Sequence, residues 1–248
     1  MAANLTTHCH RPITTVATGI VTLVSTHDPA PESEGLRRLY AHRFDDETAQ
    51  RDALWRTLCR HWFQRWVPAD AAVLDVAAGG CEFINNIVAR RRIAIDLNPA
   101  VIQHAEAGVE AHVARSTDLH MLGDATVDRA FVSNFFEHIT RDDIIATLGE
   151  IRRVLRPDGK VLILQPNIRY CARDYWMFFD HITPIDDRAL VEALTTTGFR
   201  TELNLPRFLP YTTKSRIPSG DALVRLYLRS PWSWRLMGGQ AFVVGVPL

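Results

Sequence analysis

The sequence predicts an α/β fold: a doubly wound, mostly parallel sheet with helices on both faces. Two observations support this prediction. Short apolar runs alternate with segments of helical spacing from residue 72 to residue 165, and this alternation is typical of right-handed βαβ units. The length of 248 residues, with 47% hydrophobic and 23% charged residues, suits a single domain with a sizeable core. Ligands of such sheets bind at the carboxyl ends of the strands.

The predicted elements follow one another along the chain. Leu54, Leu58 and Trp62 stand at helical spacing, which predicts a helix before the first strand. Pro99 lies near the first turn of a later helix, and Gly198 stops another. Short apolar runs between such helices predict the strands. We expect helices at 49–66, 82–90, 99–106, 142–155, 187–197 and 221–228, and strands at 72–76, 92–96, 111–114, 127–134, 160–165, 201–205 and 240–246.

The chain is expected to contain a leader and one domain. Residues 1–34 end in the linker-like run HDPAPESE, which predicts a poorly ordered leader. Residues 35–248 are expected to form a single domain. Within it, 166–185 and 206–230 depart from the regular alternation, and we expect them to be insertions that line a substrate pocket.

Composition argues against several classes of function. Lys+Arg and Asp+Glu both number 28, so the chain lacks the basic character of a general nucleic-acid binder. The four cysteines form no C-x-x-C pair, which predicts neither disulfides nor a zinc site, and we expect no metal. No apolar run approaches the roughly 20 residues of a membrane span. We therefore expect a cytoplasmic protein with a small-molecule substrate and neither a nucleic-acid partner nor a membrane span.

A strand followed by a turn of small residues occupies 73–83. Small residues let the backbone approach a ligand closely. A dinucleotide site would need G-x-G-x-x-G in this register, with phosphates at the helix N-terminus. The chain offers Ala77, Gly79 and Glu82 instead, and the bulky anion Glu82 argues against NAD or FAD. S-adenosylmethionine has no phosphate and carries a sulfonium cation, so it tolerates an acid at this turn.

This turn resembles motif I of class I S-adenosylmethionine-dependent methyltransferases, D-x-G-x-G-x-G. Asp75 and Gly79 match the motif, whereas Ala77 and Cys81 replace two of its glycines. Residues 157–164 resemble the family's R-P-G-G-x-L before the fifth strand. The resemblance extends from residue 39 to residue 248. It implies a Rossmann-like sheet of seven strands with an antiparallel C-terminal strand, and S-adenosylmethionine as the cofactor.

The resemblance also implies cofactor contacts after each of the first four strands. Asp96 is the expected ribose-binding acid, with an N-cap role before the next helix as the alternative. Asp118 is the candidate for the adenine amine; backbone groups of Ser116 and Thr117, or a plain loop acid, are the alternatives. The expected cofactor-binding residues are Tyr40, Asp75, Ala77, Gly79, Asp96, Leu97, Thr117, Asp118, Asn134 and Phe135.

Residues 127–139 resemble the fourth strand and following turn of small-molecule methyltransferases, which end in E-H. His138 would face the methyl group or lie just beneath it, where an imidazole can take a proton from a hydroxyl or amine. The alternative is a histidine that packs under the cofactor and orders the loop. Together with His138, Asp180 and His181 are the expected catalytic residues.

The segment after the fifth predicted strand is crowded with aromatic residues and punctuated by Arg169 and Arg173. Arginines suit recognition of anions, and aromatics bury apolar or sugar-like surface. The acceptor is therefore expected to join a carboxylate or phosphate to an apolar or sugar-like body, unless these aromatics are core and the bases solvated. The expected substrate-binding residues are Arg169, Tyr170, Tyr211 and Lys214.

These features predict methyl transfer from S-adenosylmethionine to a small-molecule oxygen or nitrogen. The alternative function is a protein of the same fold that binds S-adenosylmethionine without transferring its methyl group, as a repurposed enzyme or a regulatory subunit. A catalytic role for His138, Asp180 and His181 would separate the two, because a regulatory module has no need of them.

Overall fold

The computed structural model describes residues 48–211 and 220–248. The chain divides into two units, Met1–Pro31 and Glu32–Leu248, and every described residue belongs to the second. The predictions for the leader 1–34, for Tyr40 and for Lys214 lie outside the described residues.

The centre of the described domain is a seven-stranded sheet with the order β3-β2-β1-β4-β5-β7-β6. The first five strands run parallel, and β7 lies antiparallel between β5 and β6. The predicted Rossmann-like sheet with an antiparallel C-terminal strand is confirmed. The strands are β1 (Ala72–Val76), β2 (Arg91–Asp96), β3 (Val109–Val113), β4 (Val127–Ser133), β5 (Leu155–Pro166), β6 (Phe199–Leu205) and β7 (Gln240–Pro247).

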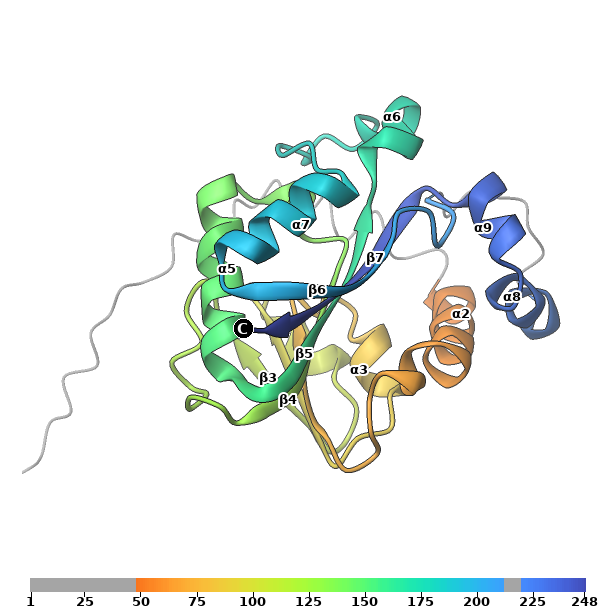
Figure 1. Ribbon diagram of the computed structural model, residues 1–248. Helices are drawn as coiled ribbons and strands as arrows, with labels where there is room; N and C mark the ends of the chain where they lie inside the picture. The colour runs from red at the N-terminus through yellow and green to blue at the C-terminus, as the bar shows by residue number, and fades with distance from the viewer. Residues whose placement is uncertain (1–47, 212–219) are drawn as a thin grey trace, which may run out of the picture. The chain divides into compact units, whose positions relative to one another are not determined.

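Helices cover both faces of this sheet, as Figure 1 shows. Side chains of successive strand residues point to opposite faces, so each strand contributes to two cores. The helices are α2 (Thr48–His61), α3 (Glu82–Asn86), α4 (Val101–His104), α5 (Arg141–Val154), α6 (Ile168–Tyr175), α7 (Asp187–Thr196), α8 (Asp221–Leu228) and α9 (Pro231–Met237), with 3₁₀ turns η1 (Phe63–Arg65) and η2 (Phe136–His138).

The two cores differ in composition. The core beneath α5 and α7 is mostly aliphatic, with Leu74, Val132 and Leu148 among its buried members. The core beneath α2 and α3 is aromatic, and Phe83 stacks on Phe131 with ring centroids 3.8 Å apart. Aromatic stacking of this kind stabilises a core beyond simple area burial. The aromatic core supports the turn between β1 and α3.

The structure differs from the predicted elements in several places; for example, α3 ends at Asn86 instead of residue 90, and α2 ends at His61 instead of residue 66. Residues 157–159 lie between the predicted helix 142–155 and the predicted strand 160–165, but they belong to β5, where the β4–β5 register shifts between Val127 and Arg129. Helix α6 was not predicted; the Asn167 side chain caps it by accepting from the Arg169 backbone N–H at 3.2 Å. Helix α9 was also not predicted, although Pro231 at its first position is a signal for a helix start.

Candidate active site

The turn from β1 into α3 contains three residues in the left-handed region. Ala77 has φ 57°, Gly79 φ 53° and Cys81 φ 61°. The backbone thus keeps a conformation that favours glycine, even though Ala77 and Cys81 carry side chains. Backbone strain of this kind clusters at ligand-binding sites. The turn predicted from the sequence is present with its glycine-requiring geometry intact.

An Ala77→Gly variant is expected to be more stable than the parent chain. The left-handed region costs an L-residue about 1–2 kcal/mol, and glycine's greater freedom in the unfolded chain offsets part of that. We expect a net gain of about 0.5–1 kcal/mol in the free energy of unfolding, measured by denaturant titration. The matched control is Ala78→Gly, at a neighbouring buried alanine without positive φ, which should lose stability. Equal effects at both positions would contradict the strain at Ala77.

Asp96 at the end of β2 binds this turn directly. Its Oδ2 accepts from the Gly79 backbone N–H at 2.8 Å, and its Oδ1 accepts from the Asn98 backbone N–H at 2.8 Å. Burial raises the pKa of Asp96 above its usual value in spite of these hydrogen bonds. The carboxylate is half-buried, so it keeps an accessible side. These hydrogen bonds fix Asp96 beside the turn, and its contact with a ribose stays a prediction.

Open space lies on the outer side of the same turn. Gly79 is exposed, and a Cβ atom built on it would meet nothing within 4 Å. Glu82, which follows the turn, forms an ion pair with Arg51 of α2 at 2.7 Å. An anionic ligand group at this helix start would therefore meet a carboxylate, as expected from the sequence, whereas a cationic ligand would not be repelled. The residues present fit S-adenosylmethionine better than a dinucleotide.

Asp75 lies inside the domain. It is 3% exposed, and burial, followed by the charges of Glu82 and Asp96, raises its pKa well above the usual value. A contact between this carboxyl group and a bound cofactor stays a prediction, and the burial favours a structural role behind the turn.

An Asp75→Asn variant should change how stability depends on pH. Because the pKa of Asp75 is raised in the folded chain, its contribution to stability is full below the unfolded pKa and is lost as pH rises through the folded pKa. The variant should therefore gain on the parent as pH rises, by on the order of 1–3 kcal/mol near pH 8. Denaturant titrations from pH 4 to pH 8 measure this, with exposed Asp70→Asn as control. A pH-independent difference would contradict the assignment.

The remaining expected cofactor residues lie at the ends of β2, β3 and β4. Leu97 and Thr117 are half-buried, whereas Asp118 is exposed and its Oδ1 lies 3.0 Å from His120 Nδ1. Asn134 is exposed with φ 47°, and half-buried Phe135 packs against the aliphatic core. All of these residues lie along the carboxyl edge of the parallel strands, as expected. Their individual contacts with a cofactor stay predictions.

The backbone ties the loop after α6 to η2. Ile182 and Thr183 both donate their N–H groups to the Glu137 carbonyl, at 2.9 and 3.1 Å. The buried Tyr175 hydroxyl donates to the Thr183 carbonyl at 2.6 Å. These bonds bring the predicted residues Asp180 and His181 next to His138, although they are far away in sequence.

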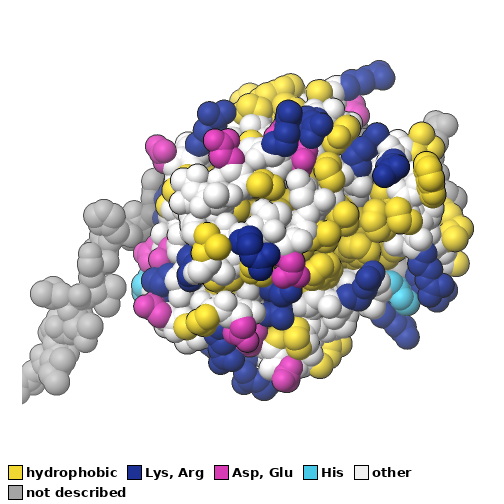
Figure 2. Space-filling model, viewed as in Figure 1, with side chains coloured by type: hydrophobic (Ala, Val, Ile, Leu, Met, Phe, Trp, Pro, Cys, Tyr) yellow, Lys and Arg dark blue, Asp and Glu magenta, His cyan; other side chains and the backbone are white. Residues whose placement is uncertain are grey.

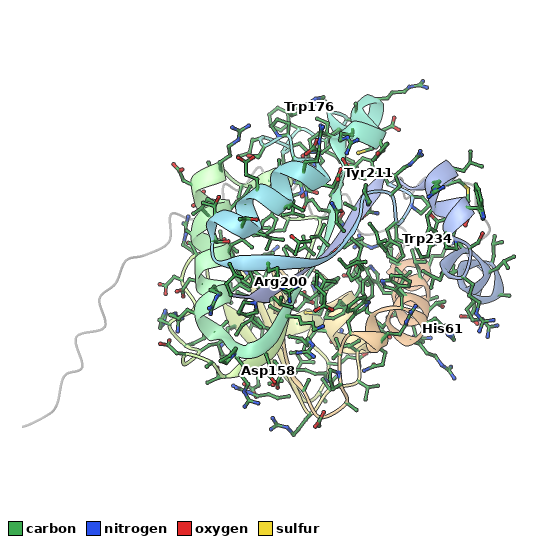
Figure 3. All side chains as sticks on the ribbon, viewed as in Figure 1. His61, Asp158, Trp176, Arg200, Tyr211 and Trp234 are labelled. Atoms are coloured by element: carbon green, nitrogen blue, oxygen red, sulfur yellow. The ribbon has the colours of Figure 1, made fainter. Side chains whose placement is uncertain are left out.

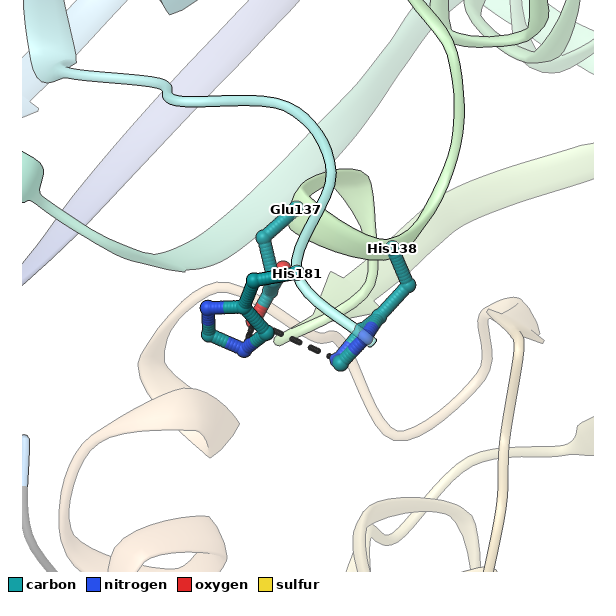
Figure 4. Close-up of side chains that lie close together, drawn as sticks. All are labelled: Glu137, His138 and His181. Carbon is teal, nitrogen blue, oxygen red and sulfur yellow. Dashed lines mark ion pairs between the residues drawn. The ribbon is translucent and has the colours of Figure 1, made fainter. Parts of the chain in front are cut away.

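The four residues Glu137, His138, Asp180 and His181 form what we call the His–carboxylate cluster. His138 Nδ1 lies 3.1 Å from Asp180 Oδ2, and His138 Nε2 lies 3.7 Å from Glu137 Oε1. His181 Nε2 lies 4.0 Å from the same Glu137 oxygen, and the two imidazole rings meet edge to face at 4.8 Å (Figure 4). The three residues expected to be catalytic are thus brought together, around a fourth that was not expected.

Glu137 is the functional candidate that sequence reasoning missed. It is 1% exposed, and its Oε2 accepts from Gln165 Nε2 at 2.7 Å. Burial raises the pKa of Glu137. Burial by itself opposes a charge on His138, but the hydrogen bond to Asp180 and the charge of Glu137 outweigh it and raise the pKa of His138. The E-H dipeptide was the available signal, but its burial could not be read from the sequence.

The expected substrate residues lie around α6. Arg169 donates to Asp187 Oδ1 at 2.8 Å, and its guanidinium lies 5.1 Å from the centroid of the Tyr170 ring. Tyr211 contacts Phe178 edge to face at 6.0 Å. Figure 3 shows Tyr211 and Trp176 at the end of the molecule where α6 lies, opposite Asp158. Arg169 is thus partly engaged within the protein, and its role toward a substrate stays a prediction.

A hollow lies away from these residues. It has a volume of about 360 Å³ and is lined by residues that include Pro68, Arg90 and Asp158. Pro68 and Arg90 flank β1 and β2 at their amino ends. Since ligands of parallel sheets bind at the carboxyl ends of the strands, this hollow is not the candidate site.

A comparison with sequence models of protein families matches the part of the chain from β1 to β5. Residues 74–163 match the sequence model of a family described as methyltransferase domain. This part of the chain is thus similar in sequence to a methyltransferase domain. The match begins within β1 and ends within β5, so it includes the turn at Gly79, Asp96 and the E-H dipeptide of the cluster. Class I methyltransferases use S-adenosylmethionine, and the turn fits this cofactor. No curated protein matches this chain in sequence.

Solved structures share the fold of this chain. A SAM-dependent methyltransferase from Archaeoglobus fulgidus is 18% identical with a TM-score of 0.59, over 86% of this chain and 99% of that chain. A chain of the complex between the Haloferax volcanii Trm112 methyltransferase activator and a methyltransferase is 18% identical with a TM-score of 0.61, over 85% and 96%. Geranyl diphosphate C-methyltransferase from Streptomyces coelicolor A3(2) is 15% identical with a TM-score of 0.53, over 93% and 91%.

The helices that surround the sheet also bear on membrane insertion. Within residues 48–211 and 220–248, each helix is too short or too polar to cross a bilayer.

Apolar side chains reach the surface on the side where α8 and α9 lie (Figure 2). They include Leu226, Trp232 and Leu236, which are 65%, 78% and 79% exposed.

Proposed function

We propose that this methyltransferase transfers the methyl group of S-adenosylmethionine to an oxygen or nitrogen atom of a small molecule. The observation that carries the proposal is the turn at Gly79 with Asp96 bound across it. The turn keeps positive φ angles at Ala77 and Cys81, where side chains make them costly. A chain under no demand for close backbone approach would have no need of this conformation.

The residues along the carboxyl edge of the parallel strands each have a proposed role in cofactor binding. The Asp96 carboxylate accepts hydrogen bonds from ribose hydroxyls, and the exposed backbone at Gly79 lies against the cofactor. Thr117, Asp118, Asn134 and Phe135 border the adenine and the methyl group. When bound, S-adenosylmethionine supplies an electrophilic methyl group on a sulfonium centre. The protein contributes positioning and exclusion of water, and these effects lower the barrier of a direct displacement.

The acceptor is proposed to lie between α6 and the carboxyl edge of the parallel strands, under the aromatic residues of 166–185. Phe178 and Tyr211 contact one another there. His138 was expected to act as a base, but both of its ring nitrogens face protein carboxylates, at 3.1 and 3.7 Å. This geometry supports the alternative in which His138 packs under the cofactor and orders the loop.

Calorimetry and a methylation screen test this function together. The full chain should bind S-adenosylhomocysteine and should not bind NADH. Incubation of metabolite extracts with the chain and S-adenosylmethionine should yield a product heavier by one methyl group, detected by mass spectrometry. Binding of NADH without a response to S-adenosylhomocysteine would overturn the cofactor assignment. Cofactor binding with protein, but no small molecule, as the methylated product would overturn the acceptor class.

An anionic acceptor is the finer part of this proposal. Arg169 and Arg207 place their guanidinium groups 5.1 and 4.8 Å from the ring centroid of exposed Tyr170. Arg169→Ala should raise KM for the acceptor roughly tenfold, because hydrogen bonds to charged groups contribute that much. Cofactor affinity should stay unchanged. Exposed Arg173→Ala is the control, and Arg169→Lys preserves the charge beside Asp187 if the alanine variant loses stability.

A neutral acceptor would contradict this prediction. So would an Arg169→Ala variant that binds the cofactor more weakly while KM for the acceptor stays the same. In either case the bases around α6 would be a solvated surface without a role in recognition.

A further inference from the structure

The His–carboxylate cluster places two acids and two imidazoles in the protein interior. The side chains of Glu137, Asp180 and His181 are 1%, 4% and 3% exposed, and that of His138 is 17% exposed. Buried charges are costly unless they are compensated by opposite charge. The ion pairs of Glu137 join it to the two histidines, and Asp180 pairs with His138. A cation bound in this cluster would compensate the buried carboxylates.

Three atoms of the cluster converge as metal ligands would. One ligand atom each from Glu137, His138 and His181 lies within 4.8 Å of the others. Two of the separations, to Glu137 Oε1, are 3.7 and 4.0 Å. Ligand atoms about 2.0–2.2 Å from one zinc ion lie roughly 3.4 Å apart in tetrahedral geometry. Small side-chain shifts toward a common centre would thus complete three bonds.

The surroundings orient these atoms in the way that metal sites require. Asp180 holds Nδ1 of His138 at 3.1 Å, which leaves Nε2 directed at Glu137. Ligating histidines commonly bond a carboxylate through their other ring nitrogen. Gln165 donates to Oε2 of Glu137 at 2.7 Å, which leaves Oε1 for the histidines. The loop with Asp180 and His181 is held in place by the two backbone bonds to the Glu137 carbonyl.

We propose that Glu137, His138 and His181 bind one divalent transition-metal ion, zinc foremost, with Asp180 and Gln165 as supporting partners. Two nitrogens and one oxygen suit zinc, cobalt or nickel, whereas magnesium and calcium prefer oxygen ligands. Three protein ligands leave one coordination position for water or another ligand. His138, the most exposed ligand, marks the side from which the ion enters. The absence of C-x-x-C pairs could not reveal this site, because the ligands come from two distant segments.

Metal binding to the untagged full chain tests the proposal directly. After dialysis against a chelator, zinc titrated into the chain should bind with a stoichiometry of one in calorimetry. Cobalt should give the visible absorption of a tetrahedral or five-coordinate site. His181→Ala and Glu137→Gln should weaken zinc on the order of 100-fold, and Asp180→Asn 10–100-fold, as for supporting partners elsewhere. Exposed His120→Ala is the matched control and should bind zinc as the parent does.

Two outcomes would overturn the proposal. The first is a parent chain that binds less than one equivalent of zinc and gives no cobalt spectrum. The second is zinc binding that survives in folded His181→Ala, since the ion would then lie elsewhere. If His181→Ala does not fold, the parent's stoichiometry and cobalt spectrum decide. S-adenosylhomocysteine binding is measured separately, so failure of the metal site leaves the proposed methyl transfer intact.

Discussion

Asp96→Ala is expected to bind S-adenosylhomocysteine on the order of 100-fold or more weakly than the parent chain. Hydrogen bonds to a charged acceptor contribute about 1.5–3 kcal/mol each, and about 1.4 kcal/mol corresponds to a factor of ten. Two ribose hydroxyls would lose such an acceptor. The variant also loses the bond from the Gly79 backbone N–H to Oδ2, so the turn itself would be less well held. Isothermal titration calorimetry measures the change.

Two variants serve as controls for Asp96→Ala. Asp96→Asn keeps the shape of the side chain and one acceptor oxygen, so its affinity should lie between those of the parent and the alanine variant. Asp118→Ala removes an exposed acid that pairs with His120 and should have a smaller effect. Circular dichroism must show that each variant is folded. A folded Asp96→Ala chain with unchanged affinity would reject the ribose role.

Phe131→Ala is expected to lower the free energy of unfolding by about 3–5 kcal/mol. Phe131 is 1% exposed and stacks on Phe83, and its ring also meets those of Trp55 and Phe63 at 6.0 and 5.1 Å. Removal of the ring leaves a cavity where four aromatic groups meet, and close-packed cores collapse only partly into such space. Denaturant titration gives the change in free energy.

The control for this cavity is Phe179→Ala. Phe179 is 90% exposed, so its removal should change stability by less than about 0.5 kcal/mol. Phe131→Leu, which leaves a smaller cavity, should fall between the two. Because Phe83 lies in α3 directly after the turn, Phe131→Ala should also weaken cofactor binding. A loss of stability near that of Phe179→Ala would show that the aromatic core tolerates the cavity.

The regular elements could be predicted from local sequence patterns. The run 72–76 coincides with β1, and helix α8 begins and ends as predicted. Buried parallel strands and amphipathic helices leave periodic signatures within one segment, which is why these elements were predicted correctly. The antiparallel C-terminal strand followed from the resemblance to methyltransferases. The irregular start of β5 was not predicted, since Pro157 and Gly159 are residue types that are typical of turns.

The site could be predicted only in part. The turn around Gly79 and the acid Asp96 each belong to a contiguous motif at the end of a strand. Their proximity could therefore be predicted from the order of the strands. The positive φ of Ala77 did not, because alanine rarely adopts it. The meeting of Glu137 with His181 depends on two backbone bonds to the Glu137 carbonyl. Such long-range pairing has no local signature, and neither does the burial that makes Glu137 a ligand candidate.

The place of β7 in the sheet has a consequence for synthesis on the ribosome. Strand β6 meets the sheet through β7, which inserts between β5 and β6. A nascent chain can therefore assemble β1 to β5 before β7 is synthesised. Strand β6 cannot join the sheet until then, because its only neighbour in the sheet is β7. Until residues 240–247 leave the exit tunnel, one long side of β5 offers unpaired backbone groups, a hazard for aggregation. Chaperone dependence during translation should accordingly be greatest in that interval.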